Sequence, residues 1–244
     1  GGGSTVARAA GEFGVIHILS SVCLPDFETV ARECDNAKIY QLYTHGDEPW
    51  VMDIIGRAQA AGYKAFCLTV DTQVYSRRER DLAKRYQPAA ARRAGFAPAQ
   101  TRPATLQASL SWELVRRIKD RFSIPLVLKG IACAEDASLA VENGVDVVYV
   151  SNHGGRQLDQ GRGTLDMLPE VVRAVGGRAK VIVDGGVLRG TDVLKALALG
   201  ADAVGIGRMQ GMALAAGGTA GVVRMLELLE TEIRTNLALM GLSS

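Results

Sequence analysis

Short apolar runs alternate with amphipathic stretches along almost the whole chain. Seven of the runs have the length and composition of buried strands: Val15–Leu19, Ile39–Tyr43, Ala65–Val70, Pro125–Lys129, Val145–Val150, Lys180–Val183 and Ala201–Ile206. Segments with helical spacing separate most of them, among them Asp26–Asp35, Trp50–Ala61, Ser111–Arg121, Ala134–Asn143, Leu165–Val175 and Thr191–Leu199. Several of these segments begin at Ser, Asp or Thr and end at Gly, as helices do. Strands that alternate with helices in this way predict a parallel sheet.

The predicted strands are apolar throughout, which indicates that both of their faces are buried, as in an α/β barrel or a doubly wound sheet. A doubly wound sheet gathers its functional residues at one crevice. Here, polar residues follow nearly every strand: Ser20, Gln41, Asp71, Lys129, His153, Asp184 and Arg208. The pattern therefore favours an α/β fold of the (β/α)8 TIM barrel class. Only seven strands are visible, and Thr5–Gly11 has the pattern of the helix that follows a first strand, so we expect this strand to be absent from the chain.

Length and composition are those of one globular domain. The chain has 244 residues, of which 48% are hydrophobic, and we expect a single barrel domain over residues 1–244. Residues 1–4 have the composition of a linker or a cut end and not of a targeting segment. Residues 81–108 carry basic side chains among alanines and prolines, which predicts an active-site loop or lid. A membrane-surface role for that segment is disfavoured because it lacks a clear apolar face, and membrane association is not expected.

Charge, cysteine usage and histidine spacing indicate which partners, cell compartment and metal sites to expect. The formal net charge is +2, and the sequence has neither a zinc-like cysteine spacing nor an RNA-binding aromatic motif, so nucleic acid is not an expected partner. The four cysteines are scattered, which predicts buried, reduced thiols and a cytoplasmic protein: Cys23, Cys34, Cys67 and Cys133. His17 and His45 have no second ligand at a suitable spacing, so no metal site is predicted.

The segment Ser151–Asp159 directly follows the apolar run Val147–Val150. It places His153 and Arg156 at the carboxyl end of a strand, where α/β barrels keep their catalytic groups. The imidazole can accept a proton, the guanidinium can bind a carboxylate with two hydrogen bonds, and Gly154 with its neighbour allows a flat ligand to approach. Together, these three features predict an active-site loop. The alternative is that His153 is a structural loop histidine beside a surface arginine.

Two later strands end in glycines, at Asp184–Gly186 and Gly205–Arg208. In barrels, the loops after the seventh and eighth strands commonly bind a phosphate group, and Asp184 and Arg208 suit sugar hydroxyls and phosphate respectively. The glycines could instead serve only tight barrel turns. Lys129 ends another strand, and its cation could stabilise negative charge on the ring of a bound ligand. Alternatively, its side chain extends from the strand end to solvent. Gln41 and Thr69 could bind the edge of the same ring.

Seven motifs together resemble the FMN-dependent 2-hydroxy acid oxidase and dehydrogenase family, which includes glycolate oxidase, lactate oxidase, mandelate dehydrogenase and flavocytochrome b2. They occur in the family's order along the chain: Gln41–Tyr43, Leu68–Thr72, Arg77–Asp81, Leu128–Gly130, Ser151–Asp159, Asp184–Gly186 and Gly207–Arg208. The resemblance implies oxidation of a small (S)-2-hydroxy acid to the 2-oxo acid, with oxygen or an electron carrier as final acceptor. It also implies a homo-oligomer, a tetramer by the habit of the family.

The resemblance assigns roles to individual residues. His153 is the implied base, and Asp71 orients it and stabilises the imidazolium. Lys129 is implied to stabilise the reduced flavin. Tyr43, Arg77 and Arg156 are implied to bind the substrate. The implied FMN-binding residues are Ser20, Gln41, Thr69, Lys129, Ser151, Asp184, Gly186, Gly207 and Arg208.

The sequence also departs from the family pattern. Leu188 stands where the family generally has an arginine, and we expect Arg189 to supply the phosphate contact instead. Gln73 and Ser76 replace a proline and a glycine before Arg77. With the missing first strand, these departures leave two alternatives open: a non-catalytic or truncated FMN-type barrel, and another FMN barrel that shares only the phosphate site.

Overall fold

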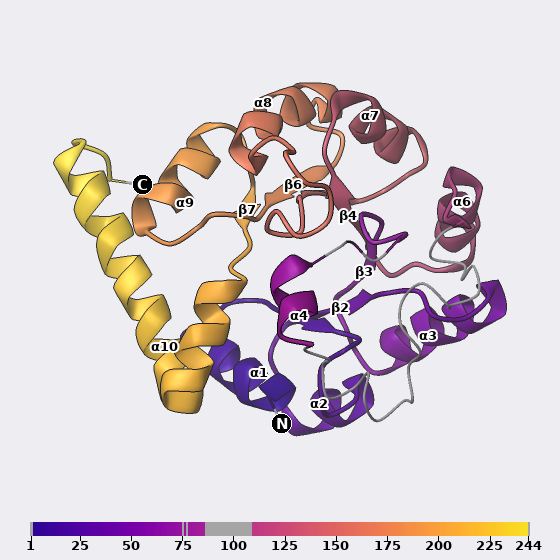
Figure 1. The fold of residues 1–244 in the computed structure, drawn as a ribbon, viewed down its shortest axis with the longest axis horizontal. Helices are drawn as coiled ribbons and strands as arrows, with labels where there is room; N and C mark the ends of the chain where they lie inside the picture. The colour runs from indigo at the N-terminus through magenta and orange to yellow at the C-terminus, as the bar shows by residue number, and fades with distance from the viewer. Residues whose placement is uncertain (1, 75, 77, 86–108, 244) are drawn as a thin grey trace.

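Seven parallel strands form one sheet in the order of the sequence. The computed structural model describes residues 2–74, 76, 78–85 and 109–243. The strands are β1 (His17–Ser20), β2 (Lys38–Leu42), β3 (Ala65–Thr69), β4 (Leu126–Ile131), β5 (Val147–Val150), β6 (Lys180–Val183) and β7 (Ala203–Val204). They curve around a common interior (Figure 1). This confirms the predicted α/β barrel architecture with seven strands and brings the carboxyl ends of all the strands to one rim.

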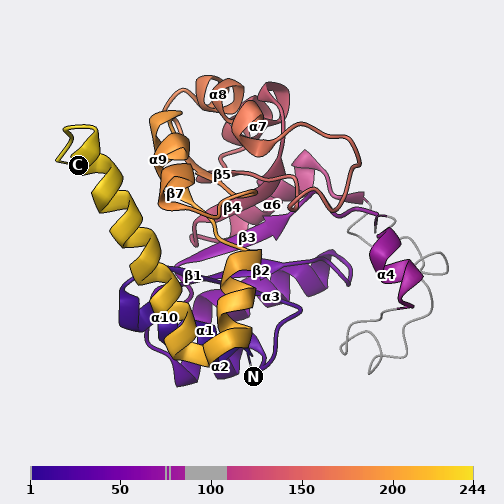
Figure 2. The same cartoon turned by 60° about the vertical axis from the view of Figure 1, so that its left-hand side comes forward.

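Helices connect successive strands and cover the outside of the sheet. They are α1 (Gly2–Phe13), α2 (Phe27–Glu33), α3 (Glu48–Ala60), α6 (Trp112–Arg121), α7 (Ala134–Glu142), α8 (Thr164–Val175), α9 (Gly190–Ala198) and α10 (Arg208–Leu239). The side chains of Asp26, Asp47 and Ser111 cap three of them by accepting hydrogen bonds from backbone N–H groups one turn on. Short α4 (Glu79–Ala83) stands away from this layer (Figure 2). The predicted loop of residues 81–108 lies mostly outside the described residues.

Both faces of the sheet are buried, as the apolar strands predicted. Alternate residues of one strand enter two different cores, because successive side chains point to opposite faces. In β3, Phe66 and Leu68 pack against the helices, whereas Ala65 and Cys67 pack inside the barrel with Tyr149. Apolar side chains thus fill the barrel interior beneath the rim that the carboxyl ends of the strands form, and they support the polar residues of that rim.

Residues 2–4 belong to the fold, so their interpretation as a linker was wrong. α1 begins at Gly2, and Gly3 and Ser4 are buried. A Cβ on Gly3 would lie 3.0 Å from Leu19 Cδ1 and 3.2 Å from the Leu24 carbonyl oxygen, so glycine permits close packing of α1 on the loop after β1. The expectation of four buried thiols holds for Cys34 and Cys67 but was wrong for Cys23, which is exposed, and Cys133 is only partly buried.

α10 is broken in the middle. Gly217 and Gly218 leave helical geometry, and the chain turns back on itself at that point (Figures 1 and 2). By length and mean hydropathy (1.4 over its most apolar window), α10 is the one helix of the described ranges that could cross a membrane. The break divides it into two shorter helices. Val222 and Met225 of the second helix pack with Ala9 of α1, close to the edge strand β1.

Candidate active site

His153 occupies a strained loop directly after β5. Its φ is 57°, and Gly154 and Gly155 follow with φ of 68° and 71°. Three consecutive left-handed residues curl the loop tightly, and the Gly155 N–H closes the turn on the Asn152 side-chain oxygen at 3.1 Å. A left-handed histidine costs about 1 kcal/mol or more, and such strain concentrates at functional sites. The consequence here is that the imidazole turns back over the barrel mouth.

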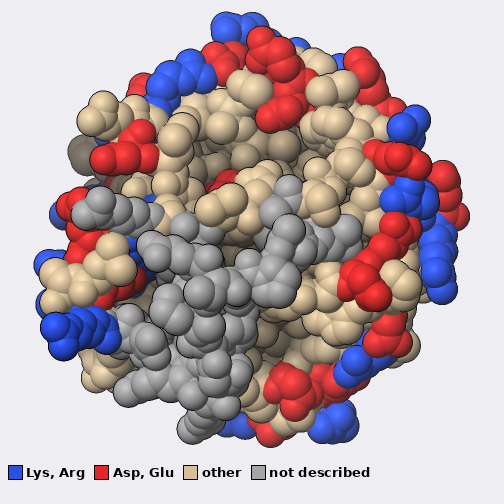
Figure 3. All heavy atoms as spheres, turned by 45° about the vertical axis from the view of Figure 1, so that its right-hand side comes forward, with Lys and Arg blue, Asp and Glu red and all other residues tan. Residues whose placement is uncertain are grey.

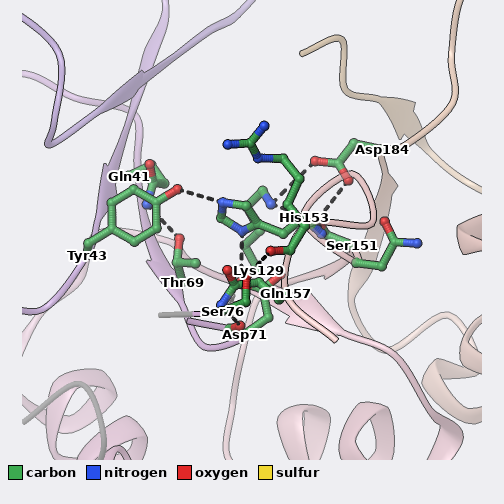
Figure 4. A network of polar contacts seen from close by, with 12 residues as sticks. Gln41, Tyr43, Thr69, Asp71, Ser76, Lys129, Ser151, His153, Gln157 and Asp184 are labelled. Carbon is green, nitrogen blue, oxygen red and sulfur yellow. Dashed lines mark hydrogen bonds and ion pairs between the residues drawn. The ribbon is translucent and has the colours of Figure 1, made fainter. Parts of the chain in front are cut away.

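The imidazole lies between two oxygen atoms. Its Nδ1 is 3.1 Å from Asp71 Oδ1, and its Nε2 is 3.2 Å from the Tyr43 hydroxyl (Figure 4). Burial raises the pKa of Tyr43 far above its usual value, and the charge of Asp71 raises it further, so Tyr43 remains a phenol at neutral pH. The carboxylate on Nδ1 places the other nitrogen, Nε2, on the open side as the proton acceptor.

Asp71 can approach the histidine because of a glycine on the neighbouring strand. Gly130 has a φ of +113°, and the register of β4 shifts between Lys129 and Ile131. A Cβ on Gly130 would lie only 2.7 Å from Asp71 Cβ. Asp71 Oδ2 is buried and has no hydrogen-bond partner among the described residues. Gly130 belongs to a motif that the sequence singled out, but its role depends on a contact between two strands that spacing alone does not reveal.

A second polar group lies beside the histidine loop. Lys129 Nζ donates to Ser151 Oγ at 2.7 Å, Ser151 Oγ donates to Asp184 Oδ1 at 2.7 Å, and Lys129 Nζ is 3.4 Å from Asp184 Oδ2 (Figure 4). The His153 backbone N–H also donates to Ser151 Oγ, at 3.2 Å. This hydroxyl therefore joins the lysine–aspartate pair to the histidine loop.

Three further predicted residues line the same rim. Gln41 and Thr69 are both buried, and Gln41 Nε2 donates to Thr69 Oγ1 at 2.6 Å. Ser20 lies at the carboxyl end of β1, in register with Gln41. Amide and hydroxyl groups thus follow three consecutive strands, where they can hydrogen-bond one edge of a planar ligand.

Side chains that the sequence analysis did not assign tie the two active-site loops together. Gln157 Nε2 donates to the backbone oxygens of Asp71 at 3.0 Å and Val74 at 3.1 Å, and Arg78 Nη2 donates to Gln157 Oε1 at 3.3 Å. The Ser76 hydroxyl donates to the Arg156 carbonyl oxygen (Figure 4). Gln157 lies inside the histidine motif, and Ser76 is one of the departures noted above, so both could have been suspected but not placed.

The predicted substrate arginines are only partly described. Arg77 lies outside the described residues. Arg156 is exposed, and its Nη2 is 3.8 Å from Asp81 Oδ2 of α4. The guanidinium thus faces a carboxylate that comes from the segment predicted to be a lid.

The predicted phosphate end, at the glycines after β6 and β7, contains Arg208 but not Arg189. Arg208 Nη2 donates to the Gly154 carbonyl oxygen at 3.1 Å, so it reaches the histidine loop. Arg189 instead pairs with Glu232 of α10 at 2.6 Å, and the Gly190 N–H donates to the same carboxylate at 2.7 Å. The contacts of Arg189 fasten α9 to α10, and the structure does not bring it together with the other predicted site residues.

Comparison with known proteins gives a consistent result. The family model described as FMN-dependent dehydrogenase matches residues 1–244. A peroxisomal (S)-2-hydroxy-acid oxidase of Oryza sativa subsp. japonica is 43% identical, and the match covers 100% of this chain and 70% of that protein. The chain belongs to the FMN-dependent 2-hydroxy acid oxidase family.

Other members of this family agree in sequence and in structure. An L-lactate oxidase of Nostoc sp. is 41% identical over 97% of this chain and 70% of its own length. The crystal structure of a mandelate oxidase with (S)-2-phenylpropionate has a TM-score of 0.86 at 41% identity and covers 98% of this chain and 69% of that chain. The same enzyme with benzoyl-formic acid gives a TM-score of 0.87. The chain thus spans about 70% of the length of these relatives.

The donor set suits FMN, which this family binds. Lys129, Ser151 and Asp184 offer a cation, a hydroxyl and a carboxylate for the ring and its sugar-like chain. At the other end, α10 begins after Gly207 beside Arg208, and the N-terminus of a helix suits a phosphate. A Cβ on Gly186 or Gly207 would meet no atom within 4 Å, which leaves open space for a ligand.

Proposed function

We propose that this protein oxidises a small (S)-2-hydroxy acid to the 2-oxo acid, with FMN as the electron acceptor. One observation carries the proposal: the Tyr43–His153–Asp71 array adjoins the Lys129–Ser151–Asp184 group, and the His153 N–H on Ser151 Oγ joins the two. A base with its own carboxylate thus lies beside a cation that can stabilise a reduced ring. An FMN barrel that shared only the phosphate site would not need the first array.

His153 Nε2 is the group that we propose takes a proton from the substrate. It removes either the hydroxyl proton or the α-proton, and in both cases the imidazole becomes a cation. Asp71 stabilises this cation through Nδ1 at 3.1 Å. The neutral phenol of Tyr43 lies 3.2 Å from Nε2 and can donate to the substrate carboxylate while the base turns toward the α-carbon.

When bound, FMN supplies the acceptor for the electron pair that leaves the α-carbon. Its ring edge would contact Ser20, Gln41, Thr69 and Lys129, and its ribityl chain Ser151 and Asp184. Gly186, Gly207 and Arg208 would hold its phosphate. The Lys129 cation would stabilise negative charge on the reduced ring.

The substrate carboxylate would be held by Arg156, with Arg77 as a second arginine from the loop after β3. Asp81 now lies 3.8 Å from Arg156, so an incoming carboxylate would replace one anion with another at this guanidinium. We further propose that oxygen or an electron carrier reoxidises the protein and that it acts as a homo-oligomer. Acidic and basic side chains are interspersed around the margin of the face in Figure 3, and we propose no nucleic-acid partner.

The test is to replace His153 with alanine and to compare it with His45→Ala at an exposed loop histidine. We expect both variants to bind FMN as the wild type does, measured by quenching of flavin fluorescence. Anaerobic reduction by substrate should slow about 10²- to 10⁴-fold in His153→Ala only, because a positioned general base contributes a factor of that order. Normal reduction in His153→Ala would show that another group is the base. A wild-type protein without FMN would favour the non-catalytic alternative.

A further inference from the structure

Gln157 joins the loop of the proposed base to the loop of its carboxylate. It is half-buried and follows His153 in the loop after β5. Its side chain reaches the loop after β3, where it lies beside Asp71 and Ser76 (Figure 4). The proposed function leaves this amide without a role.

The amide group of Gln157 uses both of its hydrogens and its oxygen. Nε2 donates to the Asp71 carbonyl oxygen at 3.0 Å and to the Val74 carbonyl oxygen at 3.1 Å, so one NH2 group holds both ends of the turn 71–74. Oε1 accepts a hydrogen bond from Arg78 Nη2 at 3.3 Å. A side-chain amide offers two donor hydrogens together with an acceptor, which a carboxylate or an apolar side chain of the same length does not.

The turn 71–74 begins where the pairing of β3 with β4 ends. The Val70 N–H still donates to the Lys129 carbonyl oxygen at 2.8 Å, but Asp71 lies beyond the strand. Gly130 of β4 packs against the Cβ of Asp71, since a Cβ on this glycine would lie only 2.7 Å away. β4 therefore limits the movement of Asp71 on one side, and Gln157 holds its carbonyl oxygen from the histidine loop.

A second hydrogen bond joins the same two loops in the opposite direction. The Ser76 hydroxyl donates to the carbonyl oxygen of Arg156, the residue before Gln157. The histidine loop needs such support because His153 has a left-handed backbone, with a φ of 57°. A strained conformation persists only where the surrounding structure fixes it. The two loops thus hold each other in place.

We propose that Gln157 is a positioning residue that keeps the Asp71 carboxylate on Nδ1 of His153. The inference rests on the proposed function, in which Asp71 stabilises the imidazolium. The Asp71 carboxylate and Nδ1 belong to separate loops and lie 3.1 Å apart. A displacement of about 1 Å in such a contact can slow a reaction about 10²-fold. Without the amide, the turn 71–74 is free to move away from the histidine loop.

The test compares two substitutions that keep the length of the side chain, Gln157→Met and Gln157→Glu. Methionine makes none of the three hydrogen bonds. Glutamate keeps an acceptor for Arg78 but loses both donors to the turn 71–74. We expect both variants to slow anaerobic reduction of the FMN-loaded protein at saturating substrate by about 10- to 10²-fold. A wild-type rate in Gln157→Glu would overturn the inference, because the two donors would then have no part in positioning Asp71.

Gln59→Met is the matched control. Gln59 Oε1 accepts a hydrogen bond from the Ile124 N–H at 3.3 Å, between α3 and the segment before β4, outside the predicted site. We expect this variant to lower the melting temperature and to leave the rate of reduction unchanged.

An Asp71→Ala background separates positioning from a general loss of stability. In this background, Gln157→Met should slow reduction by less than about threefold, because the carboxylate that Gln157 positions is already absent. A further loss as large as that in the wild-type background would contradict the positioning role.

Another measurement needs no flavin. The chain has three histidines, and the proton between His153 Nδ1 and Asp71 should give a low-field proton NMR signal in the apoprotein, assigned by its loss in His153→Ala. We expect Gln157→Met to abolish this signal and Gln59→Met to retain it. An unchanged signal in Gln157→Met would show that the amide does not hold the contact.

These results distinguish the inference from the proposed function. If 2-hydroxy acids reduce the flavin of the wild type and Gln157→Met matches Gln59→Met in rate and in NMR signal, Gln157 has no positioning role and the inference fails. If no 2-hydroxy acid reduces the flavin of the wild type, the proposed function fails, and the low-field signal of the apoprotein alone decides whether Gln157 holds Asp71 on the imidazole.

Discussion

Exchanging Asp71 for asparagine removes the charge beside the proposed base and preserves its shape. Asp71 Oδ1 lies 3.1 Å from His153 Nδ1, and the two side chains are only 12% and 16% exposed. The asparagine oxygen can still accept the Nδ1 hydrogen bond. The variant therefore isolates the electrostatic part of the interaction with the imidazolium.

The size of the effect follows from Coulomb's law. Opposite charges about 4 Å apart interact by about 4 kcal/mol at an effective dielectric constant of about 20. The remaining neutral hydrogen bond retains about 1 kcal/mol of that stabilisation. The barrier to proton removal should thus rise by about 3 kcal/mol, which slows the step about 10²-fold.

The assay is anaerobic stopped-flow reduction of the FMN-loaded protein at saturating substrate. The control is Asp159→Asn, the same exchange at an exposed position of the histidine loop. We expect a 10²-fold loss for Asp71→Asn, with a nearly unchanged apparent dissociation constant for substrate, and no loss for the control. A rate within threefold of the wild type would refute the role of Asp71 in stabilising the imidazolium.

Three further predictions concern crowding, pH and the phosphate end. Gly130→Ala should displace Asp71 and slow reduction, whereas Gly62→Ala, also at positive φ but with no atom near its Cβ, should lower only the melting temperature. Burial lowers the pKa of His17 from 6.5 to about 4, so the contribution of neutral His17 to stability is full above pH 6.5 and falls as the pH drops toward 4. Urea unfolding should therefore give a free energy of unfolding that is lower at pH 5 than at pH 7 by an extra amount of about 2 kcal/mol, and His17→Gln should abolish this extra loss. Arg208→Ala should weaken FMN binding at least about tenfold by fluorescence titration, whereas Arg189→Ala should change it little. Equal losses of FMN affinity in the two arginine variants, or equal rates of reduction in the two glycine variants, would contradict the geometry. So would a pH dependence of stability that is unchanged in His17→Gln.

The sheet could be predicted from the sequence because each strand is a continuous apolar run between helical patterns. The predicted run Ala65–Val70 differs from β3 by one residue, and Lys180–Val183 is identical to β6. The last run was extended too far, since β7 covers only Ala203–Val204. Gly205 and Gly207 favour a turn there more strongly than the apolar residues between them favour a strand.

The residue types of the site were also visible in the sequence, but its contacts were not. The motif around His153 places a base after β5, and the strand order then brings Asp71 and Tyr43 to the same rim. The approach of Asp71 to Gly130 depends on the register between β3 and β4. The pairing of Arg189 with Glu232 likewise joins residues 43 positions apart, and a local pattern carries no information on such a contact.

The most direct test of the central claim is an anaerobic visible spectrum of the FMN-loaded wild-type protein before and after addition of lactate, glycolate or mandelate. The arrangement of His153 beside Lys129 predicts that at least one of these acids bleaches the flavin absorption and yields one equivalent of its 2-oxo acid per FMN. Bound flavin that keeps its full absorption with all three acids would contradict the proposed oxidation of small 2-hydroxy acids.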